Sequence, residues 1–348
     1  MAYNPLSFSK SINDELSHAL VTTLNSGFWS TGPESLLLQR NFNQLYNRYC
    51  IATSSGGSAL QLLSEVYPSI KKIAVQSNTY FATCLPWLNK GCEIVLMGSS
   101  GTLLMPDIDV VKAAIETSPD AIVITHIGGY PHPHISEIAA LCLKNGILLF
   151  EDCAHAPLAY IDNKIVGTFG NAAVLSFYPT KPIPGGEGGL LILESESLST
   201  SASKIRDYGK SINNEVVTHR LPALPNARMN EFTASVVNVI LKNYHTIISH
   251  KNRLAAIYDD VLGPLSYFTS NYSSQSVRPS YYKYICFLDS HKLSTSQVYD
   301  RSNQIYSILS ENLVPFGFVG DEYYTLPHTC LPITPSMSLS DARSIVLN

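Results

Sequence analysis

Six short, continuously apolar segments run through the middle of the chain and constrain its fold more than any other feature. They begin at Lys71, Glu93, Ala121, Ile147, Ala172 and Gly188, and read KKIAVQ, EIVLMG, AIVITH, ILLFED, AAVLSF and GGLLILE. Continuous apolarity, without alternation, is typical of strands that are covered on both faces. Segments with helical spacing lie between them; HISEIAALCLKNG at 134–146 ends in a glycine suited to a helix cap. Strands alternating with helices predict an α/β fold, with a mostly parallel central sheet flanked by helices.

The pattern changes after Gly189, which indicates a second domain. Residues 230–262 have the composition and spacing of long helix. Beyond them, PSYYKYICFLD at 279–289 and TCLPITP at 329–335 look like pieces of strand. We therefore expect a large domain over residues 1–245, with its N-terminal segment, and a small α+β domain over residues 246–348.

Composition excludes several function classes. Charged residues make up 14% of the 348, with a net charge of −4, and no Lys/Arg cluster provides a nucleic-acid footprint. No apolar run approaches the roughly 20 residues that span a bilayer, and the first residues lack a signal-peptide pattern. The seven cysteines form no CxxC pair, which favours free thiols in a reducing compartment. We expect a cytoplasmic protein that binds neither nucleic acid nor membrane.

Polar side chains follow the ends of two predicted strands. ILLFED ends in Glu151 and Asp152, whereas AAVLSF leads into Ser176 and, five residues later, Lys181. Ligands of open α/β sheets bind outside the carboxyl ends of the strands, so a carboxylate and an amine are expected at one edge. A lysine can form a Schiff base with the aldehyde of pyridoxal phosphate, and an aspartate can keep its ring nitrogen protonated. Taken alone, Lys181 fits a surface lysine better than a functional one, whereas Asp152 fits a helix cap and a functional carboxylate equally well.

The segment ATSSGGSALQLL at 52–63 is a candidate phosphate cradle. Ser54 to Ser58 precede a predicted helix, where small residues let the backbone approach a phosphate and hydroxyls can donate to it. Tyr80 follows the strand KKIAVQ and is placed to cover a flat ring. Plainer interpretations stay open: SSGGS as a turn, Tyr80 as packing, and His155 as a hydrogen-bonded core histidine. A functional site becomes the better interpretation because all of these residues are expected at the same edge of the sheet.

The stretch from Glu151 to Gly189 resembles the DegT/DnrJ/EryC1/StrS family of sugar aminotransferases, which have the aspartate aminotransferase fold (pyridoxal-phosphate fold type I). Its sequence, EDCAHAPLAYIDNKIVGTFGNAAVLSFYPTKPIPGGEGG, has the family's acidic motif, Gly-Thr-Phe-Gly turn and lysine loop in order. Further matches are TGP at Thr31, SSGGSAL at Ser54, PDIDVV at Pro106, THIGGYP at Thr125 and NARMNEFTA at Asn226. The resemblance covers most of residues 25–262.

The resemblance implies roles for individual residues. Lys181 is the Schiff-base lysine and proton carrier, and Asp152 pairs with the pyridine nitrogen. His155 lies beside the ring, Tyr80 stacks on it, and Asn226 reaches the cofactor phosphate of a neighbouring subunit. The full cofactor-binding set is Gly56, Gly57, Ser58, Tyr80, Asp152, His155, Ser176, Lys181 and Asn226. The protein is then an obligate homodimer with shared active sites, and it needs no metal.

Several positions depart from the family pattern. Gly57 stands where the family commonly has a phosphate-loop threonine, so one hydroxyl donor is lost. Ala227 replaces the tyrosine of an Asn-Tyr-Arg motif, and residues 264–325 resemble the family only loosely. That part of the family helps to shape the sugar pocket, so substrate identity is the least constrained inference.

The resemblance implies a pyridoxal-phosphate-dependent aminotransferase that converts a nucleotide-linked keto-deoxy sugar into an amino sugar, with glutamate as amine donor. Lys181 argues against a related branch that has histidine at this position and removes a sugar hydroxyl. Two alternatives stay open: a cyclitol aminotransferase that acts on a keto-inositol, and a regulator that binds pyridoxal phosphate without catalysis. A dinucleotide-binding domain is not indicated, because no GxGxxG follows an early strand.

Overall fold

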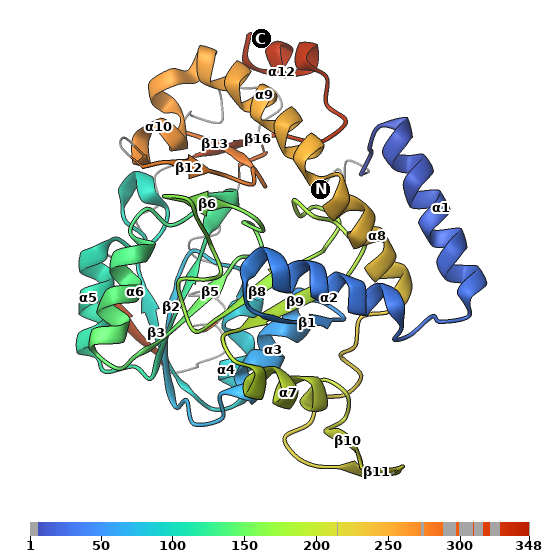
Figure 1. Ribbon diagram of the computed structural model, residues 1–348. Coiled ribbons are helices and arrows are strands. Elements are labelled where there is room, and N and C mark those ends of the chain that lie inside the picture. Colours follow the sequence, from blue (N-terminus) through green and yellow to red (C-terminus); the bar gives the residue numbers. More distant parts are fainter. Residues whose placement is uncertain are drawn as a thin grey trace. The chain divides into compact units, whose positions relative to one another are not determined.

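A computed structural model describes residues 6–213, 215–272, 275–287, 297–298, 309, 316–320 and 328–347 (Figure 1). The chain divides into two compact units, each made of two stretches of sequence. The first unit is Met1–Ser69 with Asn171–Tyr244, and the second is Ile70–Gly170 with His245–Asn348. The predicted domains, 1–245 and 246–348, stay a prediction.

The strands of the first unit are antiparallel. β9 (Gly189–Leu193) lies between β1 (Tyr49–Thr53) and β8 (Ala172–Ser176), and Ile192 is in register with both Cys50 and Ala173. Every residue of β8 and β9 is buried, as their continuous apolarity predicts. β1 was not predicted, because YCIAT is a short apolar run without a flanking signal. Within this unit, β9 therefore runs antiparallel to both of its neighbours.

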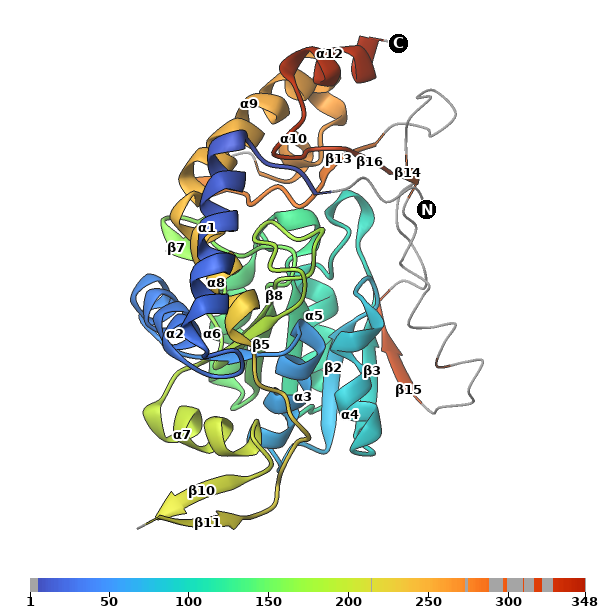
Figure 2. The same ribbon diagram turned by 90° about the vertical axis from the view of Figure 1, so that its right-hand side faces the viewer.

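Helices surround these strands. The first unit contains α1 (Lys10–Ser26), α2 (Pro33–Tyr46), α3 (Gly56–Val66), α7 (Glu196–Ile205), α8 (Glu231–Lys242) and the hairpin β10 (Lys210–Asn213)–β11 (Val216–His219). The carboxylate of Glu231 on α8 accepts hydrogen bonds from the backbone N–H groups of Glu34 (2.7 Å) and Ser35 (3.0 Å). A buried carboxylate at a helix N-terminus satisfies donors that the helix leaves unpaired, so α8 fixes the start of α2. Figure 2 shows the hairpin extending away from α7.

The second unit contains a five-stranded parallel sheet. Its order is β5 (Leu148–Asp152), β4 (Ala121–Thr125), β2 (Lys72–Gln76), β3 (Glu93–Met97) and β15 (Phe316–Val319). The four predicted strands of this unit are confirmed, and β15 comes from a region without a strand signal. α5 (Ile108–Glu116) and α6 (Ile135–Lys144) pack on one face of this sheet (Figure 1). As predicted, α6 ends just before Gly146, and this glycine has a left-handed backbone conformation. On β5, Phe150 stacks on Trp87 of α4 (Leu85–Asn89) with ring centroids 5.9 Å apart.

The rest of the second unit is built on a tyrosine-rich core. Among the described residues, its regular elements are α9 (Tyr244–Leu262), α10 (Tyr267–Asn271), α12 (Leu339–Leu347), β6 (Tyr160–Ile161), β7 (Lys164–Ile165), β12 (Val277–Arg278), β13 (Tyr284–Cys286), β14 (Gln297–Val298) and β16 (Thr329–Leu331). Short 3₁₀ turns are η1 (Phe81–Thr83), η2 (Gly101–Leu103), η3 (Ile127–Gly129) and η4 (Gly263–Leu265). The hydroxyls of Tyr258 and Tyr267 donate to the carbonyls of Pro332 (2.7 Å) and Leu103 (2.6 Å). These bonds satisfy the buried hydroxyls of Tyr258 and Tyr267 within the core.

The predicted long helix at 230–262 is two helices. α8 ends at Lys242, and Asn243 leaves the helical region of the Ramachandran plot before α9 begins at Tyr244. The strand pieces predicted near 284 and 329 are confirmed as β13 and β16, which pair antiparallel. Residues 288 and 289 of the first piece lie outside the described residues. Among the described helices, none combines the length and apolarity needed to traverse a bilayer.

Candidate active site

Asp152 ends β5 and is buried with its carboxylate held by two donors. Oδ1 accepts from the backbone N–H of Ala154 (3.0 Å), and Oδ2 accepts from the hydroxyl of Thr83 (2.7 Å). A carboxylate offers about four lone-pair sites, so these two bonds fix its orientation while leaving acceptor capacity for another donor. A protonated heterocyclic nitrogen is a donor of that kind.

His155 and Tyr80 line one cavity in the second unit, with a volume of about 60 Å³. The ring of His155 stacks on Tyr282, with centroids 4.3 Å apart and an interplanar angle of 22°. Tyr80 is more than half exposed, so its side chain has room to cover a ligand. The lining consists of Asn78, Thr79, Tyr80, Ile127, Gly128, His155, Tyr282, Lys283, Ile285, His328 and Cys330. The cavity is small, mostly aromatic and aliphatic, and has a lysine at its wall.

The serine–glycine loop of the first unit begins α3. Ser55 is the N-cap, and its Oγ accepts from the backbone N–H of Ser58 (3.0 Å). The hydroxyl of Ser58 lies 2.9 Å from that of Ser54 and 3.0 Å from that of Ser55. Hydroxyls and backbone N–H groups therefore gather at a helix N-terminus, where the helix dipole favours an anion.

The packing of this loop requires a glycine at position 56 but not at position 57. A Cβ on Gly56 would lie 2.8 Å from the Cβ of Ser176, so glycine is needed for the loop to pack against the end of β8. This contact brings Ser176 to the loop, as expected for a shared phosphate site. A Cβ on Gly57 would meet only the Ser55 hydroxyl, at 3.7 Å, and the position is exposed. The backbone therefore does not require the glycine that replaces the family's threonine.

Lys181 lies in the turn that follows β8 and is half-buried. Its backbone N–H donates to the carbonyl of Tyr178 (2.9 Å), and Gly185 closes the loop by donating to Phe177 (2.7 Å). Gly186 and Gly188 have positive φ angles of 86° and 120°, which L-residues rarely adopt. The glycines after the lysine thus turn the chain back into β9.

Asn226 is exposed and lies beside the serine loop, in a segment whose Ala227 is buried. The carbonyl of Ala227 accepts from the backbone N–H of Ser54 (2.8 Å), which ties the segment to the loop of the same chain. The Asn226 Oδ1 accepts from the backbone N–H of Arg228 (3.1 Å), while the side chain stays exposed. The guanidinium of Arg228 is paired with Asp207.

The predicted site residues thus form two groups. The first unit brings together Gly56, Gly57, Ser58 and Ser176, with Asn226 next to them and Lys181 five residues beyond Ser176. The second unit contains Asp152, His155 and Tyr80, the last two on one cavity. Sequence reasoning missed Thr83, Tyr282 and Lys283. The signal for Thr83 was its place after a predicted strand, in the loop that carries Tyr80.

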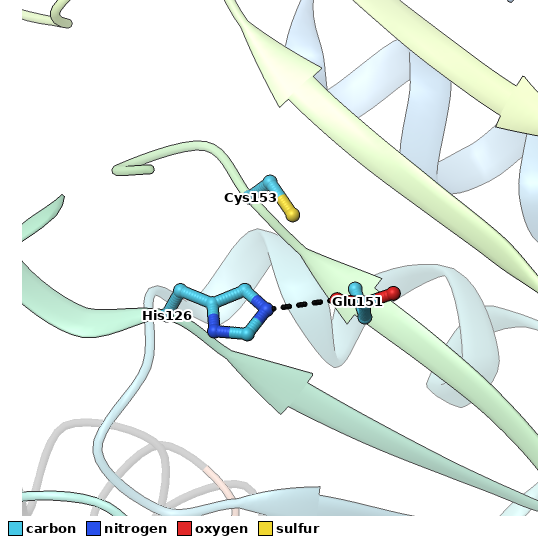
Figure 3. A group of neighbouring side chains, drawn as sticks. All are labelled: His126, Glu151 and Cys153. Carbon is cyan, nitrogen blue, oxygen red and sulfur yellow. Dashed lines mark hydrogen bonds and ion pairs between the residues drawn. The ribbon is translucent and has the colours of Figure 1, made fainter. Parts of the chain in front are cut away.

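Glu151, the residue before Asp152, belongs to a separate buried cluster whose role is structural. Glu151, His126 and Cys153 offer potential metal-ligand atoms within 4.8 Å of one another, and all three are buried (Figure 3). Glu151 accepts four hydrogen bonds: from the N–H groups of Gly167 (2.8 Å), Phe169 (2.7 Å) and Gly170 (2.8 Å), and from His126 Nε2 (3.1 Å).

The atoms of His126 and Glu151 that could bind a metal are therefore already engaged in hydrogen bonds. His126 Nδ1 accepts from the backbone of His132 (2.9 Å), so Nε2 carries the proton that it donates to Glu151. Burial, followed by the charges of Glu151 and Asp152, raises the pKa of the Cys153 thiol, which disfavours the thiolate that a metal needs. We conclude that Glu151 anchors the Gly-Thr-Phe-Gly turn at 167–170.

Comparison with known proteins gives the class. Residues 10–346 match the DegT/DnrJ/EryC1/StrS aminotransferase family, so the chain belongs to that family. The predicted family and the predicted enzyme class, aminotransferase, are confirmed.

Individual relatives agree with this assignment. The erythromycin biosynthesis sensory transduction protein EryC1 of Saccharopolyspora erythraea is 28% identical over 255 residues, 72% of this chain and 68% of that protein. The dTDP-3-amino-3,4,6-trideoxy-alpha-D-glucose transaminase of Micromonospora megalomicea is 28% identical over 233 residues, covering 65% of this chain and 61% of that protein.

A solved structure shows the same fold. Helicobacter pylori PseC, an aminotransferase involved in the biosynthesis of pseudoaminic acid, superposes with a TM-score of 0.86. The alignment covers 99% of this chain and 97% of PseC at 19% sequence identity. This likeness confirms the predicted α/β aminotransferase fold class.

Proposed function

We propose that the protein uses pyridoxal phosphate to transfer an amino group from glutamate to a nucleotide-linked keto-deoxy sugar. The observation that carries this proposal is the buried Asp152 carboxylate, which two donors orient at the end of a parallel strand. The aminotransferase family of the chain and its lysine loop agree with it. The transaminase relative is named for a dTDP-linked amino sugar, which supports the substrate class.

The residues present fit this cofactor. The close approach of Gly56 to Ser176 and the hydroxyls at the start of α3 suit a phosphate. We assign the phosphate to Gly56, Gly57, Ser58 and Ser176, the ring nitrogen to Asp152, and the ring faces to Tyr80 and His155. Lys181 supplies the amine that holds the aldehyde, and Asn226 contributes to the site of a neighbouring subunit.

Each residue then has a definite task. When bound, pyridoxal phosphate withdraws electrons from the carbon that carries the transferred nitrogen. Asp152 holds the proton of the ring nitrogen and so maintains that withdrawal. Lys181 Nζ would take the proton from the donor carbon and pass it to the cofactor, and would carry a proton in the reverse direction, onto the acceptor carbon, in the second half of the reaction. The donor and the acceptor use the same residues in turn, which predicts ping-pong kinetics.

The cavity of the second unit is our candidate for the reacting part of both substrates. Lys283 lines it, with Nζ 5.3 Å from the centroid of the Tyr282 ring. Glutamate and a nucleotide sugar are both anionic, and a lysine attracts a carboxylate or a phosphate. Lys283→Gln should therefore raise the KM for an anionic substrate about tenfold with a smaller change in kcat. An unchanged KM for both substrates would remove Lys283 from substrate binding.

A homodimer with shared sites is part of the proposal. On and beside α1 and α2, five large apolar side chains are at least half exposed: Val21, Leu24, Phe28, Trp29 and Leu36. An apolar surface of this kind suits contact with a second copy of the chain. Mixing inactive Lys181→Ala with inactive Asn226→Ala should restore part of the activity, because each heterodimer contains one intact site. No recovery after demonstrated subunit exchange would contradict shared sites.

The substrate proposal is tested with purified protein, pyridoxal phosphate and glutamate. Nucleotide-linked 3-keto and 4-keto sugars are compared with ketocyclitols, and amino products are measured by mass spectrometry. We expect amination of a nucleotide keto sugar. Amination of ketocyclitols alone would establish the cyclitol alternative instead.

The non-catalytic alternative also has one supporting observation, since the relative EryC1 is named a sensory transduction protein. A regulator would bind the cofactor without reacting with an amine donor. We expect glutamate to abolish the visible absorbance of the bound cofactor, and persistence of that absorbance with every donor tested would favour the regulator.

A further inference from the structure

A row of three buried threonines leads to the carboxylate of Asp152. The Thr83 hydroxyl lies 2.7 Å from Asp152 Oδ2, the Thr79 hydroxyl 3.0 Å from that of Thr83, and the Thr125 hydroxyl 2.8 Å from that of Thr79. The threonines are 0–3% exposed and Asp152 is 4% exposed. No bulk water screens these bonds, so each hydroxyl depends on its neighbour in the row.

The chemistry of Asp152 sets the direction of every bond. An ionised carboxylate only accepts, so Thr83 must donate its single hydroxyl proton to Oδ2. The oxygen of Thr83 then accepts from Thr79, and the oxygen of Thr79 accepts from Thr125. Three O–H dipoles therefore point the same way and end on the carboxylate, and each polarises the next.

The far end of the row is fixed by the sheet. Thr125 ends β4 and is in register with Asp152 of β5. Its backbone N–H donates to Gln76 Oε1 at the end of β2 (2.9 Å), and Gln76 Nε2 donates to the carbonyl of Asn78 (2.8 Å). The ends of three parallel strands and the loop after β2 thus position the hydroxyls.

Shape alone does not explain three threonines here. Valine has nearly the same shape and would avoid the cost of burying a hydroxyl. The row is therefore explained by what its hydroxyls donate to. We propose that Thr83, Thr79 and Thr125 form a relay that orients the Asp152 carboxylate and stabilises its anion, which keeps the proton on the ring nitrogen of the cofactor. Thr83 is then a positioning residue that acts through Asp152, an inference that rests on the proposed function.

The test compares Thr83→Val, Thr83→Ser and Thr125→Val with the wild-type protein. The control is Thr117→Val, which removes a partly buried hydroxyl in the same unit whose bond, to the carbonyl of Ala114 (2.8 Å), is local. The dissociation constant of pyridoxal phosphate, the absorption spectrum of the bound cofactor and the melting temperature of the cofactor-free protein are measured for each.

We expect Thr83→Val to weaken cofactor binding about tenfold, since it removes one hydrogen bond to a charged group. The bound spectrum should shift toward the form with an unprotonated ring. Thr83→Ser should restore both properties, and Thr125→Val should weaken binding about twofold to threefold because its effect passes through two further bonds.

The outcomes separate the relay from the proposed function. A wild-type protein that binds no pyridoxal phosphate would overturn the proposed function and the relay with it. Normal wild-type binding, with Thr83→Val matching Thr117→Val in affinity and spectrum, would overturn the relay alone. If Thr83→Val does not fold, Thr125→Val decides, and a wild-type spectrum and affinity in that variant would contradict the relay.

Discussion

Glu151 and Asp152 are neighbours on one strand, yet their surroundings differ in kind. Glu151 accepts four hydrogen bonds, three of them from the backbone of the turn at 167–170. Asp152 accepts two, one of them from Thr83, the last member of the threonine row. Successive side chains of a strand point to opposite faces, so a single residue step separates the two environments.

This difference separates a carboxylate that holds the fold together from the one to which we assign the cofactor. The oxygens of Glu151 are saturated, and the glycines of the turn fit around it: a Cβ on Gly170 would lie 2.3 Å from the carbonyl oxygen of Leu149. Asp152 is oriented but retains acceptor capacity. Burial and charge alone would not distinguish the two, whereas counting hydrogen bonds does.

Replacing Asp152 should have the strongest consequence for activity. Asp152→Asn should lower kcat by at least about a hundredfold, because the amide cannot hold the ring proton as a carboxylate does. The melting temperature of the cofactor-free protein should change little. Steady-state kinetics and thermal unfolding check this, and near wild-type kcat would show that Asp152 does not meet the ring nitrogen.

Glu151→Gln should show the opposite pattern, with stability lost by roughly 3 kcal/mol and activity per folded molecule largely kept. Burial opposes ionisation of Glu151, but His126 and the N–H groups of Gly167 and Gly170 outweigh it and lower the pKa. Its folded-state pKa lies below its unfolded value, so its stabilisation is present above the unfolded pKa and is lost as pH falls.

Urea unfolding at pH 4 and pH 6 measures both effects. The wild-type protein should lose more stability than Glu151→Gln when the pH falls from 6 to 4. Equal losses would mean that Glu151 does not contribute through its charge.

Lys251 is a buried basic residue that, unlike Glu151, has one hydrogen bond to its charged group. Its Nζ donates to the carbonyl of Tyr281 (2.9 Å), and burial, then the charge of Lys283, lowers its pKa to about 7. Between pH 7 and the unfolded pKa near 10.5 the unfolded chain binds more protons, so stability should rise with pH. One proton contributes about 1.4 kcal/mol per pH unit, or roughly 2 kcal/mol from pH 7 to pH 9.

Replacing Lys251 by Met removes this proton uptake and should flatten the rise. Urea titrations of both proteins at pH 7 and pH 9 give the comparison, with exposed Lys144→Met as the control. Parallel slopes for wild type and Lys251→Met would show that Lys251 keeps an ordinary pKa in the fold.

The smallest expected effect lies in the serine–glycine loop. Gly57→Thr should be tolerated, because only the Ser55 hydroxyl lies near the added Cβ, and a threonine should lower the dissociation constant of pyridoxal phosphate twofold to fivefold. Gly56→Ala, its matched control, should weaken binding, because its Cβ would collide with Ser176. Equal behaviour of the two variants would contradict the loop geometry.

The sequence predicted the parts of this molecule that local pattern determines. Continuous apolar runs gave β2 to β5, β8 and β9, and strand ends pointed to Asp152 and to the loop of Lys181. β1 and β15 were missed, since their strand character comes from the partners they pair with. Thr83 was missed because its hydrogen-bond partner, Asp152, lies 69 residues later in the chain. Lys283 was missed because the cavity that it lines is formed by residues from several other elements. The break between α8 and α9 at Asn243 interrupts an otherwise helical composition and left no clear signal.

The most direct test of the account asks where the cofactor is attached. The protein is incubated with pyridoxal phosphate, reduced with borohydride, digested and examined by peptide mass spectrometry, with Lys181→Ala and Lys283→Gln treated alongside. We expect one added cofactor mass on Lys181 in the wild-type and Lys283→Gln proteins, and none in Lys181→Ala. Label on another lysine, or on no residue of a protein saturated with cofactor, would contradict it.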